Sequence, residues 1–204
     1  MVSPKAAKNI LTIDTSLNKG YITFNGASKV IESDAMNYHS AYLVGEIKKI
    51  LNGQKPEVIG VDAGPGSFTG IRVGVTVARV MGQQLKCRVV PVSSCEILSE
   101  ANNRSIVIMD ARRGMYYFCH EEKITLISRA EIELIPPQSV ICDNSSLDML
   151  KGFGFDARSY EKENLPLGET LARLTEEKLE SEEEFSWASV KPLYIQTPPI
   201  FGQK

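Results

Sequence analysis

The residues best suited to bind a ligand form one glycine-rich run, residues 64–74 (GPGSFTGIRVG). The run follows an apolar stretch predicted as a strand and opens a long predicted helix, and the free N–H groups at a helix N-terminus bind phosphate. It has no lysine, which a Walker loop requires, and Thr69 stands where a dinucleotide-binding loop needs its third glycine. We therefore treat Gly64, Gly66, Ser67 and Thr69 as a nucleotide-proximal loop rather than as a self-sufficient nucleotide site.

Other residue types that commonly carry chemistry are few. Asp14 ends the first predicted strand, where its carboxylate could hold a metal-bound water or a phosphate, or could cap the following turn. His39 opens the first predicted helix, but the position four residues on, where a metal pair needs its second ligand, is Leu43. The chain has only two histidines, so no Ser/His/Asp or Cys/His set can be assembled. We expect no metal site and no catalytic residue.

The long predicted helix, residues 68–85, carries a stripe of very small side chains. Its members recur every four residues and are Gly70, Gly74, Ala78 and Gly82. A glycine inside a helix costs about 1 kcal/mol relative to alanine, so a close contact must compensate for three of them. Such a stripe lets a second helix approach closely. A protein–protein interface is the favoured interpretation, and packing against the protein's own sheet is the alternative. Arg72 and Arg79 belong to a separate polar stripe.

The elements that must position these residues begin as an antiparallel meander and continue as alternating strands and helices. Strands are predicted at 10–13, 21–24, 29–33, 58–61, 89–90, 105–109, 115–120, 124–127 and 140–142, and helices at 38–51, 68–85, 94–102 and 165–185. This order indicates an α/β fold with mixed sheets. The boundary at 102–103 predicts a lobe of residues 1–102, joined by 186–204, and a smaller lobe of residues 103–185. No internal repeat is visible.

Composition narrows the function classes. The chain has 204 residues, 43% of them apolar, and 23 Lys and Arg against 25 Asp and Glu. That balance argues against strong RNA binding by the chain alone. No apolar run approaches the ~20 residues that span a bilayer, and no secretory signal opens the chain. The four cysteines are scattered without a Cys-x-x-Cys pair, which predicts reduced thiols in a cytoplasmic protein without membrane contact.

The glycine-rich run resembles the signature of the TsaB (YeaZ) family. Four further segments resemble the family's pattern in the same order: residues 13–16 (IDTS), 92–94 with Glu96, 110–114 (DARRG) with Tyr116, and 191–194 (KPLY). The matches extend over almost the whole chain. The departures from the family's pattern are Ala41, Asp62, Met115 and Gln196.

The resemblance implies an actin/Hsp70/sugar-kinase-like fold whose two lobes are related to ribonuclease H. It also implies a part in making N6-threonylcarbamoyladenosine in tRNA, as a non-catalytic scaffold that dimerises with the catalytic paralogue TsaD and acts with the ATPase TsaE. The family dimerises through its first two long helices, which makes the candidate interface residues His39, Tyr42, Gly70, Arg72, Gly74, Ala78, Arg79 and Gly82.

Further expectations follow from this resemblance. ATP or ADP would bind only where the two subunits meet, tRNA would bind only through the complex, and the isolated chain could form a homodimer. The alternative is an autonomous enzyme of the same fold, either a small-molecule kinase or a metallopeptidase-like protein. The missing Walker lysine and the missing His pair argue against both.

Overall fold

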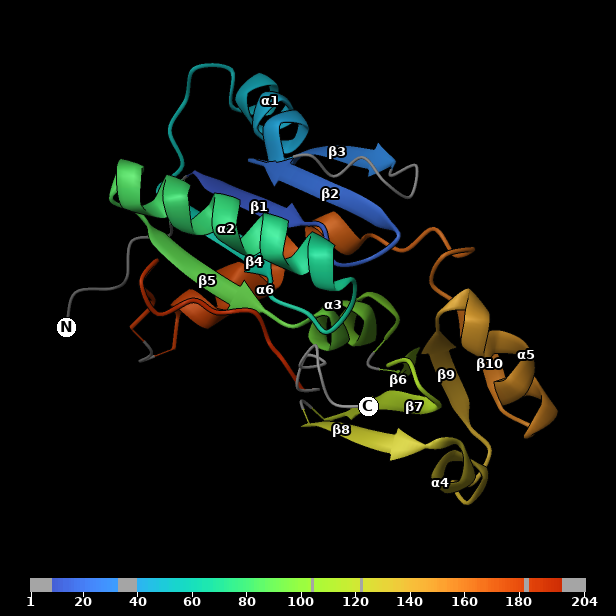
Figure 1. The fold of residues 1–204 in the computed structure, drawn as a ribbon. Coiled ribbons are helices and arrows are strands. Elements are labelled where there is room, and N and C mark those ends of the chain that lie inside the picture. Colours follow the sequence, from blue (N-terminus) through green and yellow to red (C-terminus); the bar gives the residue numbers. More distant parts are fainter. Residues whose placement is uncertain (1–8, 33–39, 104, 122, 182–183, 196–204) are drawn as a thin grey trace.

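The computed structural model describes residues 9–32, 40–103, 105–121, 123–181 and 184–195. The first part of the chain forms a five-stranded sheet. Its strands are β1 (Ile10–Asp14), β2 (Lys19–Phe24), β3 (Ala27–Glu32), β4 (Val58–Asp62) and β5 (Arg88–Val92). They lie in the order β3-β2-β1-β4-β5 (Figure 1). The first three strands pair antiparallel, and β4 and β5 run parallel to β1, so the sheet is mixed.

A second five-stranded sheet follows. Its strands are β6 (Ile106–Asp110), β7 (Met115–His120), β8 (Lys123–Ser128), β9 (Ser139–Cys142) and β10 (Asp156–Ser159). Their order is β8-β7-β6-β9-β10, again an antiparallel meander with two parallel strands beside its first member. The prediction of a two-lobed α/β fold with mixed sheets is confirmed.

The two sheets are a structural repeat, although no repeat is visible in the sequence. Both have the same strand order, and β6, β7 and β8 begin at residues 106, 115 and 123, each 96 positions after the start of β1, β2 and β3 at 10, 19 and 27. The repeat escapes the sequence because a buried strand demands apolar side chains and not particular ones. Strand ends in one lobe therefore have counterparts in the other.

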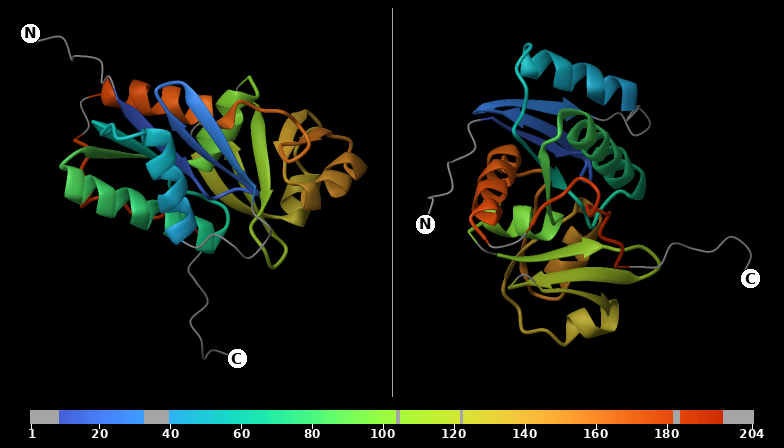
Figure 2. Two further views of the ribbon diagram at one scale, coloured as in Figure 1. Left: turned by 90° about the horizontal axis from the view of Figure 1, so that it is seen from above. Right: turned by 90° about the vertical axis from the view of Figure 1, so that its left-hand side faces the viewer.

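Six helices cover the sheets in the described part of the chain. They are α1 (Ser40–Leu51), α2 (Phe68–Leu85), α3 (Ser94–Ala101), α4 (Arg129–Glu133), α5 (Asn144–Gly152) and α6 (Leu167–Leu179). Helices α1 and α2 cover one face of the first sheet and α6 the opposite face, whereas α4 and α5 lie against the second sheet (Figures 1 and 2). Across the described residues, none of these helices has the length and apolar character that a bilayer crossing requires.

Local sequence explains where several elements begin and end. Asn25 and Gly26 both have positive φ, 49° and 83°, as the tight turn between β2 and β3 requires. Ser67 caps α2 by accepting a hydrogen bond from the Gly70 N–H at 3.2 Å. Ser93 caps α3 in a reciprocal arrangement with Glu96. These caps hold the starts of α2 and α3 at the carboxyl ends of β4 and β5.

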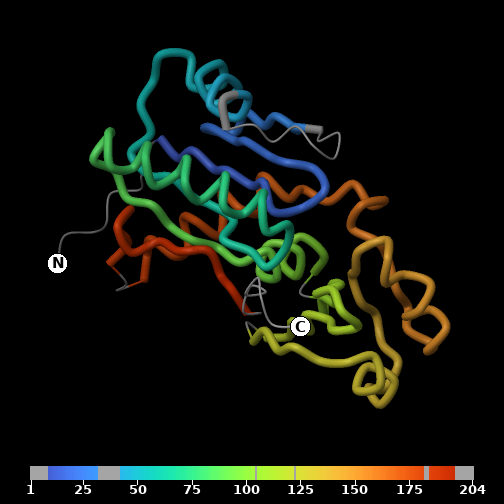
Figure 3. The backbone as a smooth tube through the Cα atoms, in the orientation of Figure 1, coloured from blue at the N-terminus to red at the C-terminus, as the bar shows by residue number. Residues whose placement is uncertain are grey.

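Helix α6 belongs to the first sheet in space, although residues 103–185 are predicted as one smaller lobe. The chain passes to the second sheet after α3 and returns before α6, which packs on β1, β2, β4 and β5 (Figure 3). Its close approach depends on Gly168, where a Cβ would lie 2.7 Å from Thr23 Cγ2. The prediction that α6 belongs to the smaller lobe is therefore wrong. It relied on position in the sequence, and segments that are neighbours in the sequence need not pack on the same sheet.

Two of the four cysteines are joined, so the prediction of four reduced thiols is wrong for this structure. Cys95 of α3 and Cys119 of β7 form a disulfide with their Cα atoms 5.9 Å apart. Cys87 and Cys142 are free. The pair is 24 positions apart in the chain and becomes visible only when α3 packs beside the second sheet.

Candidate functional site

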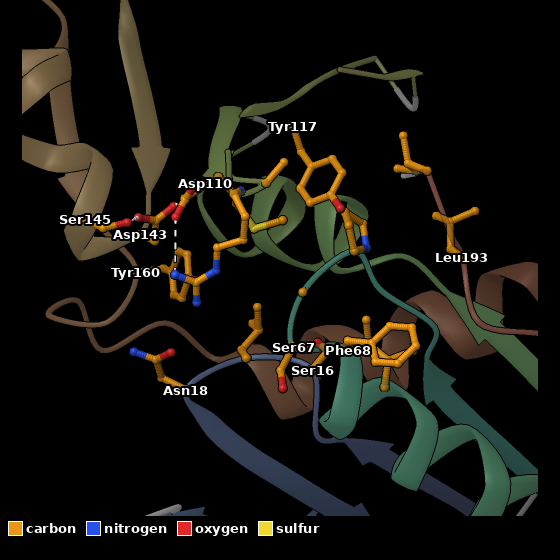
Figure 4. A pocket seen from close by; sticks show the side chains of 18 of the residues that line it. Ser16, Asn18, Ser67, Phe68, Asp110, Tyr117, Asp143, Ser145, Tyr160 and Leu193 are labelled. Carbon is orange, nitrogen blue, oxygen red and sulfur yellow. Dashed lines mark hydrogen bonds and ion pairs between the residues drawn. The ribbon is translucent and has the colours of Figure 1, made fainter. Parts of the chain in front are cut away.

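A cleft of about 1010 Å³ lies between the two sheets (Figure 4). Its walls come from the turn after β1, the loop before α2, the turn after β6, the start of α5, and the segment 193–195. Ligands of open α/β sheets bind outside the carboxyl ends of the strands. Because β1, β4, β6 and β9 all end at this cleft or directly behind it, the fold itself makes the cleft the candidate ligand site.

The glycine-rich loop forms one wall of this cleft. Gly66, Ser67 and Thr69 line it, whereas Gly64 is buried and does not. Gly66 is held close to the turn after β1, since a Cβ there would lie 2.5 Å from the Ser16 carbonyl oxygen, and that same oxygen accepts the Ser67 N–H at 2.7 Å. Gly64 has φ +100°, a conformation that side chains other than hydrogen rarely adopt. The glycines therefore allow a close backbone approach here.

Behind this loop, two buried carboxyl groups share a set of hydroxyl groups. Asp14 and Asp62 are each 1% exposed. The Ser94 hydroxyl donates to Asp62 Oδ1 at 2.7 Å, and the Ser16 hydroxyl lies within hydrogen-bond distance of both carboxyl groups. The Ser16 and Gly64 N–H groups donate to Asp14 at 2.9 Å and to Asp62 at 2.7 Å. The cluster therefore ties together the ends of β1 and β4 and the start of α3.

This geometry decides between the two roles considered for Asp14. Its Oδ1 accepts the N–H two residues on, so Asp14 caps the turn after β1. Its Oδ2 is buried and has no hydrogen-bond partner among the described residues. Burial raises the pKa of Asp14 well above its ordinary value, and the negative charge of Asp62 raises that pKa further. The sequence analysis named Asp62 only as a departure from the family's pattern. Its position at the end of a buried apolar strand, like that of Asp14, could have indicated a place in this cluster.

The raised pKa of Asp14 predicts a pH-dependent gain from Asp14→Asn. A carboxyl whose pKa rises on folding contributes its full stability below the unfolded pKa of about 3.9 and loses it as pH rises through the folded value. Asparagine keeps the acceptor oxygen and carries no charge. We expect the variant to have a higher urea midpoint than the parent at pH 7, with the difference shrinking towards pH 4.

Asp62→Asn is the matched control for that prediction. It replaces one acceptor oxygen of a carboxylate that receives hydrogen bonds from Ser94 and Gly64, so its urea midpoint should fall at pH 4. Burial also raises the pKa of Asp62, so at pH 7 the removal of its charge offsets part of this loss, and its midpoint should stay below that of Asp14→Asn. Equal midpoints for Asp14→Asn and the parent from pH 4 to 7 would contradict a charged, buried Asp14.

The second sheet presents the counterparts of these two acids. Asp110 ends β6 as Asp14 ends β1, and Asp143 follows β9 as Asp62 ends β4. Asp143 caps α5 by accepting the Ser146 N–H at 2.9 Å, and it accepts the Asp110 N–H at 2.7 Å. Asp110 in turn accepts the Arg112 N–H at 2.7 Å. The acids on this side of the cleft are thus also engaged with the chain's own groups.

Two arginines stand on the turn between β6 and β7. Arg112 and Arg113 are exposed at the cleft and have positive φ, 70° and 55°. The Arg112 guanidinium lies 3.6 Å from Asp110 Oδ2. Within the described residues, no group of three or more His, Cys, Asp or Glu side chains is arranged to hold a metal ion.

The small-residue stripe of α2 faces the protein's own sheet, so the interface interpretation of the stripe is wrong. All four of its members are buried. A Cβ at Gly70 would overlap the Thr15 carbonyl oxygen, and one at Gly74 would lie 2.5 Å from Thr15 Oγ1. Thr15 Oγ1 also donates to the Gly70 carbonyl at 2.7 Å. The compensating close contact is therefore internal, between α2 and β1, and Gly82 makes a similar one with Val89 of β5.

The remaining interface candidates have different surroundings. His39 lies outside the described residues. Tyr42 of α1 is 49% exposed, and Arg72 of α2 is exposed, with its guanidinium carbon 5.3 Å from the centre of the Phe68 ring. Arg79 is half-buried and donates through Nε to the Trp187 carbonyl at 3.1 Å, so it holds the C-terminal segment. Of these candidates, Tyr42 and Arg72 are on the surface.

Exposed apolar side chains nevertheless occur on the two long helices. Val44 of α1 is 48% exposed, and Phe68 and Val80 of α2 are 46% and 52% exposed. Phe68 and Arg72 are four residues apart and so share one face of α2, and Val80 is exposed two turns further along the helix. We call Tyr42, Val44, Phe68, Arg72 and Val80 the outer helical surface. The sequence does not show which apolar residues of α2 are exposed, because valines occur on nearly every side of this helix.

Comparison with known proteins identifies the family. Residues 29–150 match the family model described as TsaD: tRNA N6-adenosine threonylcarbamoyltransferase, which is more than half of the 204 residues. The chain belongs to this family. Its curated relatives are TsaB proteins: it is 34% identical over 157 residues to the one from Bacillus subtilis, a match that covers 70% of this chain and 66% of that protein. A match to TsaB of Buchnera aphidicola subsp. Schizaphis graminum is 29% identical over 123 residues and covers 53% and 58%. The resemblance to TsaB (YeaZ) is confirmed.

The matched part spans about half to two thirds of the curated relatives' length. Two solved structures from Pseudomonas aeruginosa extend the likeness of the fold. YeaZ superimposes with a TM-score of 0.69 at 17% identity, and a protein described as similar to peptidase YeaZ with 0.72 at 16%. They cover 92% and 93% of this chain and all of their own. The two-lobe fold implied by the family is thereby confirmed.

The departures from the family's pattern lie in different surroundings. Asp62 belongs to the buried cluster described above. Met115 begins β7, and its carbonyl accepts the Ala111 N–H at 2.9 Å, which closes the turn that carries the two arginines. Ala41 lies in α1, and Gln196 lies outside the described residues. Asp62 therefore alters the chemistry behind the cleft, as described above.

Proposed function

We propose that this chain is a non-catalytic subunit in the formation of N6-threonylcarbamoyladenosine in tRNA, where it binds a TsaD-like paralogue and acts with a TsaE-like ATPase. The process is supported by its curated relatives, which are named tRNA threonylcarbamoyladenosine biosynthesis proteins. A paralogous partner is supported by the match of residues 29–150 to the TsaD model, because proteins that share a fold can form a pseudo-symmetric pair.

The proposal that the chain is non-catalytic is supported by the burial and the hydrogen bonds of the carboxyl groups around the cleft. A general base needs a free lone pair within hydrogen-bond reach of the substrate. Asp14 and Asp62 are buried behind the cleft wall, and Asp143 accepts hydrogen bonds from the start of α5 and from Asp110. Carboxylates therefore end the strands where the fold would place catalytic groups, but they hold the chain together. This arrangement favours a scaffold over an enzyme.

The outer helical surface is the proposed contact with the paralogue. It offers apolar side chains from α1 and α2, which cover the same face of the first sheet and contact each other (Figure 2). Exposed apolar clusters rimmed by polar residues mark protein interfaces. The Arg72 guanidinium lies over the Phe68 ring there, a cation–π contact that favours one arrangement of these two side chains. The same surface would pair two copies of this chain when the paralogue is absent.

The loop at the start of α2 continues this surface into the cleft. Phe68 belongs to both, and Ser67 and Thr69 flank it. ATP or ADP bound where the subunits meet would reach these residues and the first N–H groups of α2. The tRNA would be held through the complex, since 23 basic against 25 acidic residues leave this chain little capacity for counterion release.

Reconstitution with purified proteins tests the proposal. The full chain, the TsaD-like and the TsaE-like proteins of the same cell are mixed with unmodified tRNA, ATP and the activated threonylcarbamoyl donor, and nucleosides are measured by mass spectrometry. We expect modification in the complete mixture, a loss of at least about tenfold when this chain is omitted, and none from this chain alone. Modification by the chain alone would identify an enzyme, and modification unaffected by omitting it would exclude the scaffold role.

A further inference from the structure

The disulfide between Cys95 and Cys119 joins two parts of the fold that belong to different sheets. Cys95 is the second residue of α3, and the neighbouring Ser94 binds Asp62, so α3 is fastened to the end of β4. Cys119 lies inside β7, opposite Val107 of β6 and Ile124 of β8, so it is fastened to the second sheet. The bond is therefore a direct tie between the two lobes.

The tie lies in the apolar core that forms the floor of the cleft. Cys95 and Cys119 are each 4% exposed and belong to one cluster with Leu17, Met109 and Tyr117. These three residues also line the cleft. Tyr117 and Cys119 are two residues apart on one strand and so point to the same side of the sheet. A change in the distance between the two sulfur atoms would therefore shift side chains that line the cleft.

The tie matters because the chain itself crosses between the sheets at few places. In the described residues it passes to the second sheet between α3 and β6 and returns between β10 and α6 (Figure 3). Two lobes joined by a pair of connections can close and open as a hinge. A third covalent connection, the Cys95–Cys119 bond, restricts that motion.

We propose that the Cys95–Cys119 pair is a redox-dependent lock between the lobes, which limits opening of the cleft when it is a disulfide and permits opening when it is two thiols. This inference is independent of the proposed function in tRNA modification. The step is thiol–disulfide exchange with a small disulfide such as oxidised glutathione. The two protein thiols lose two electrons and two protons as their S–S bond forms, and the small disulfide gains both to leave as two thiols.

The enclosure of both sulfur atoms adds a kinetic feature. An incoming small disulfide must reach one sulfur to form the mixed intermediate, and the closed core leaves no space for it. Exchange in either direction therefore requires a transient local opening of the core around the pair. The lock follows the slow redox balance of its surroundings and does not respond to brief oxidant pulses.

Thiol counting on the purified full chain tests whether the lock forms. The protein is equilibrated with dithiothreitol or with oxidised glutathione, denatured, alkylated with a maleimide and analysed by mass spectrometry and peptide mapping. We expect four labelled cysteines after reduction and two after oxidation, with Cys95 and Cys119 recovered as one linked peptide pair. Cys87→Ser is the control, since it removes a free thiol and should leave the linked pair unchanged.

Thermal melting and hydrogen exchange test whether the bond acts as a lock. Reduction should lower the melting temperature by about 5–10 °C. It should also speed amide exchange at least about threefold in residues 109–113 and in Tyr117, which line the cleft, and leave β3 unchanged. Cys119→Ser should match the reduced parent under both conditions. Four thiols after oxidation, a bond between other cysteines, or a bond without any change in exchange at the cleft would each overturn the proposal.

Discussion

Replacing Gly70 by alanine is expected to lower the free energy of unfolding by about 3 kcal/mol, the upper end of the cost of overpacking a core. The added methyl group would overlap the Thr15 carbonyl oxygen, which is main chain at the end of β1 and cannot rotate away. It would also strain the hydrogen bond from Thr15 Oγ1 to the Gly70 carbonyl. A loss of this size lowers the melting temperature by about 6–12 °C for a chain of this length.

Gly45→Ala in α1 is the matched control, because it is the same substitution in a neighbouring helix. A Cβ at Gly45 would meet nothing within 4 Å, so only helix propensity changes and the variant should gain about 0.5–1 kcal/mol. A free small-residue stripe would make the two variants alike, both slightly stabilised. Opposite signs support the internal contact between α2 and β1, whereas a Gly70→Ala protein that melts at or above the parent's temperature contradicts it.

The sequence was informative wherever an element is determined by its own residues. Helix α2 spans Phe68–Leu85 and β7 spans Met115–His120, both as predicted, because each has an apolar pattern between clear end signals. The Asn25-Gly26 turn was also readable, since few other residue pairs adopt two positive φ angles. The last helix ends at Leu179 instead of 185, although the glutamates that follow have a composition typical of helices.

The sequence was less informative about which surfaces meet. A stripe of small residues states that something packs closely, but Gly74 is equally suited to a partner helix and to Thr15 of its own sheet. The pairing of Cys95 with Cys119 and the packing of α6 on the first sheet depend on contacts between distant segments. Asp62 is decisive behind the cleft only because the fold brings Ser16 and Ser94 to it. Each of these features depends on tertiary packing, which leaves no pattern in the local sequence.

Val80→Glu is expected to weaken binding to the TsaD-like paralogue at least about 30-fold, if the outer helical surface is the contact. Val80 is 52% exposed and belongs to that surface, so a glutamate is solvated in the free chain and costs little stability. In the complex its charge would be buried among apolar groups without a partner, a penalty of about 2 kcal/mol or more. Titration calorimetry or analytical ultracentrifugation with the paralogue measures the change, and a melting curve verifies the fold.

Leu134→Glu is the matched control for this last prediction. Leu134 follows α4 at the far end of the second lobe and is 83% exposed, so the same apolar-to-acid change alters net charge equally but touches no part of the outer helical surface. Its affinity for the paralogue should equal that of the parent. Equal weakening by both variants would point to long-range charge repulsion, and unchanged binding by Val80→Glu would place the contact elsewhere on the molecule. A loss confined to Val80→Glu, in a protein that melts like its parent, is the expected result because α2 then presents its small residues inwards and its larger ones to the partner.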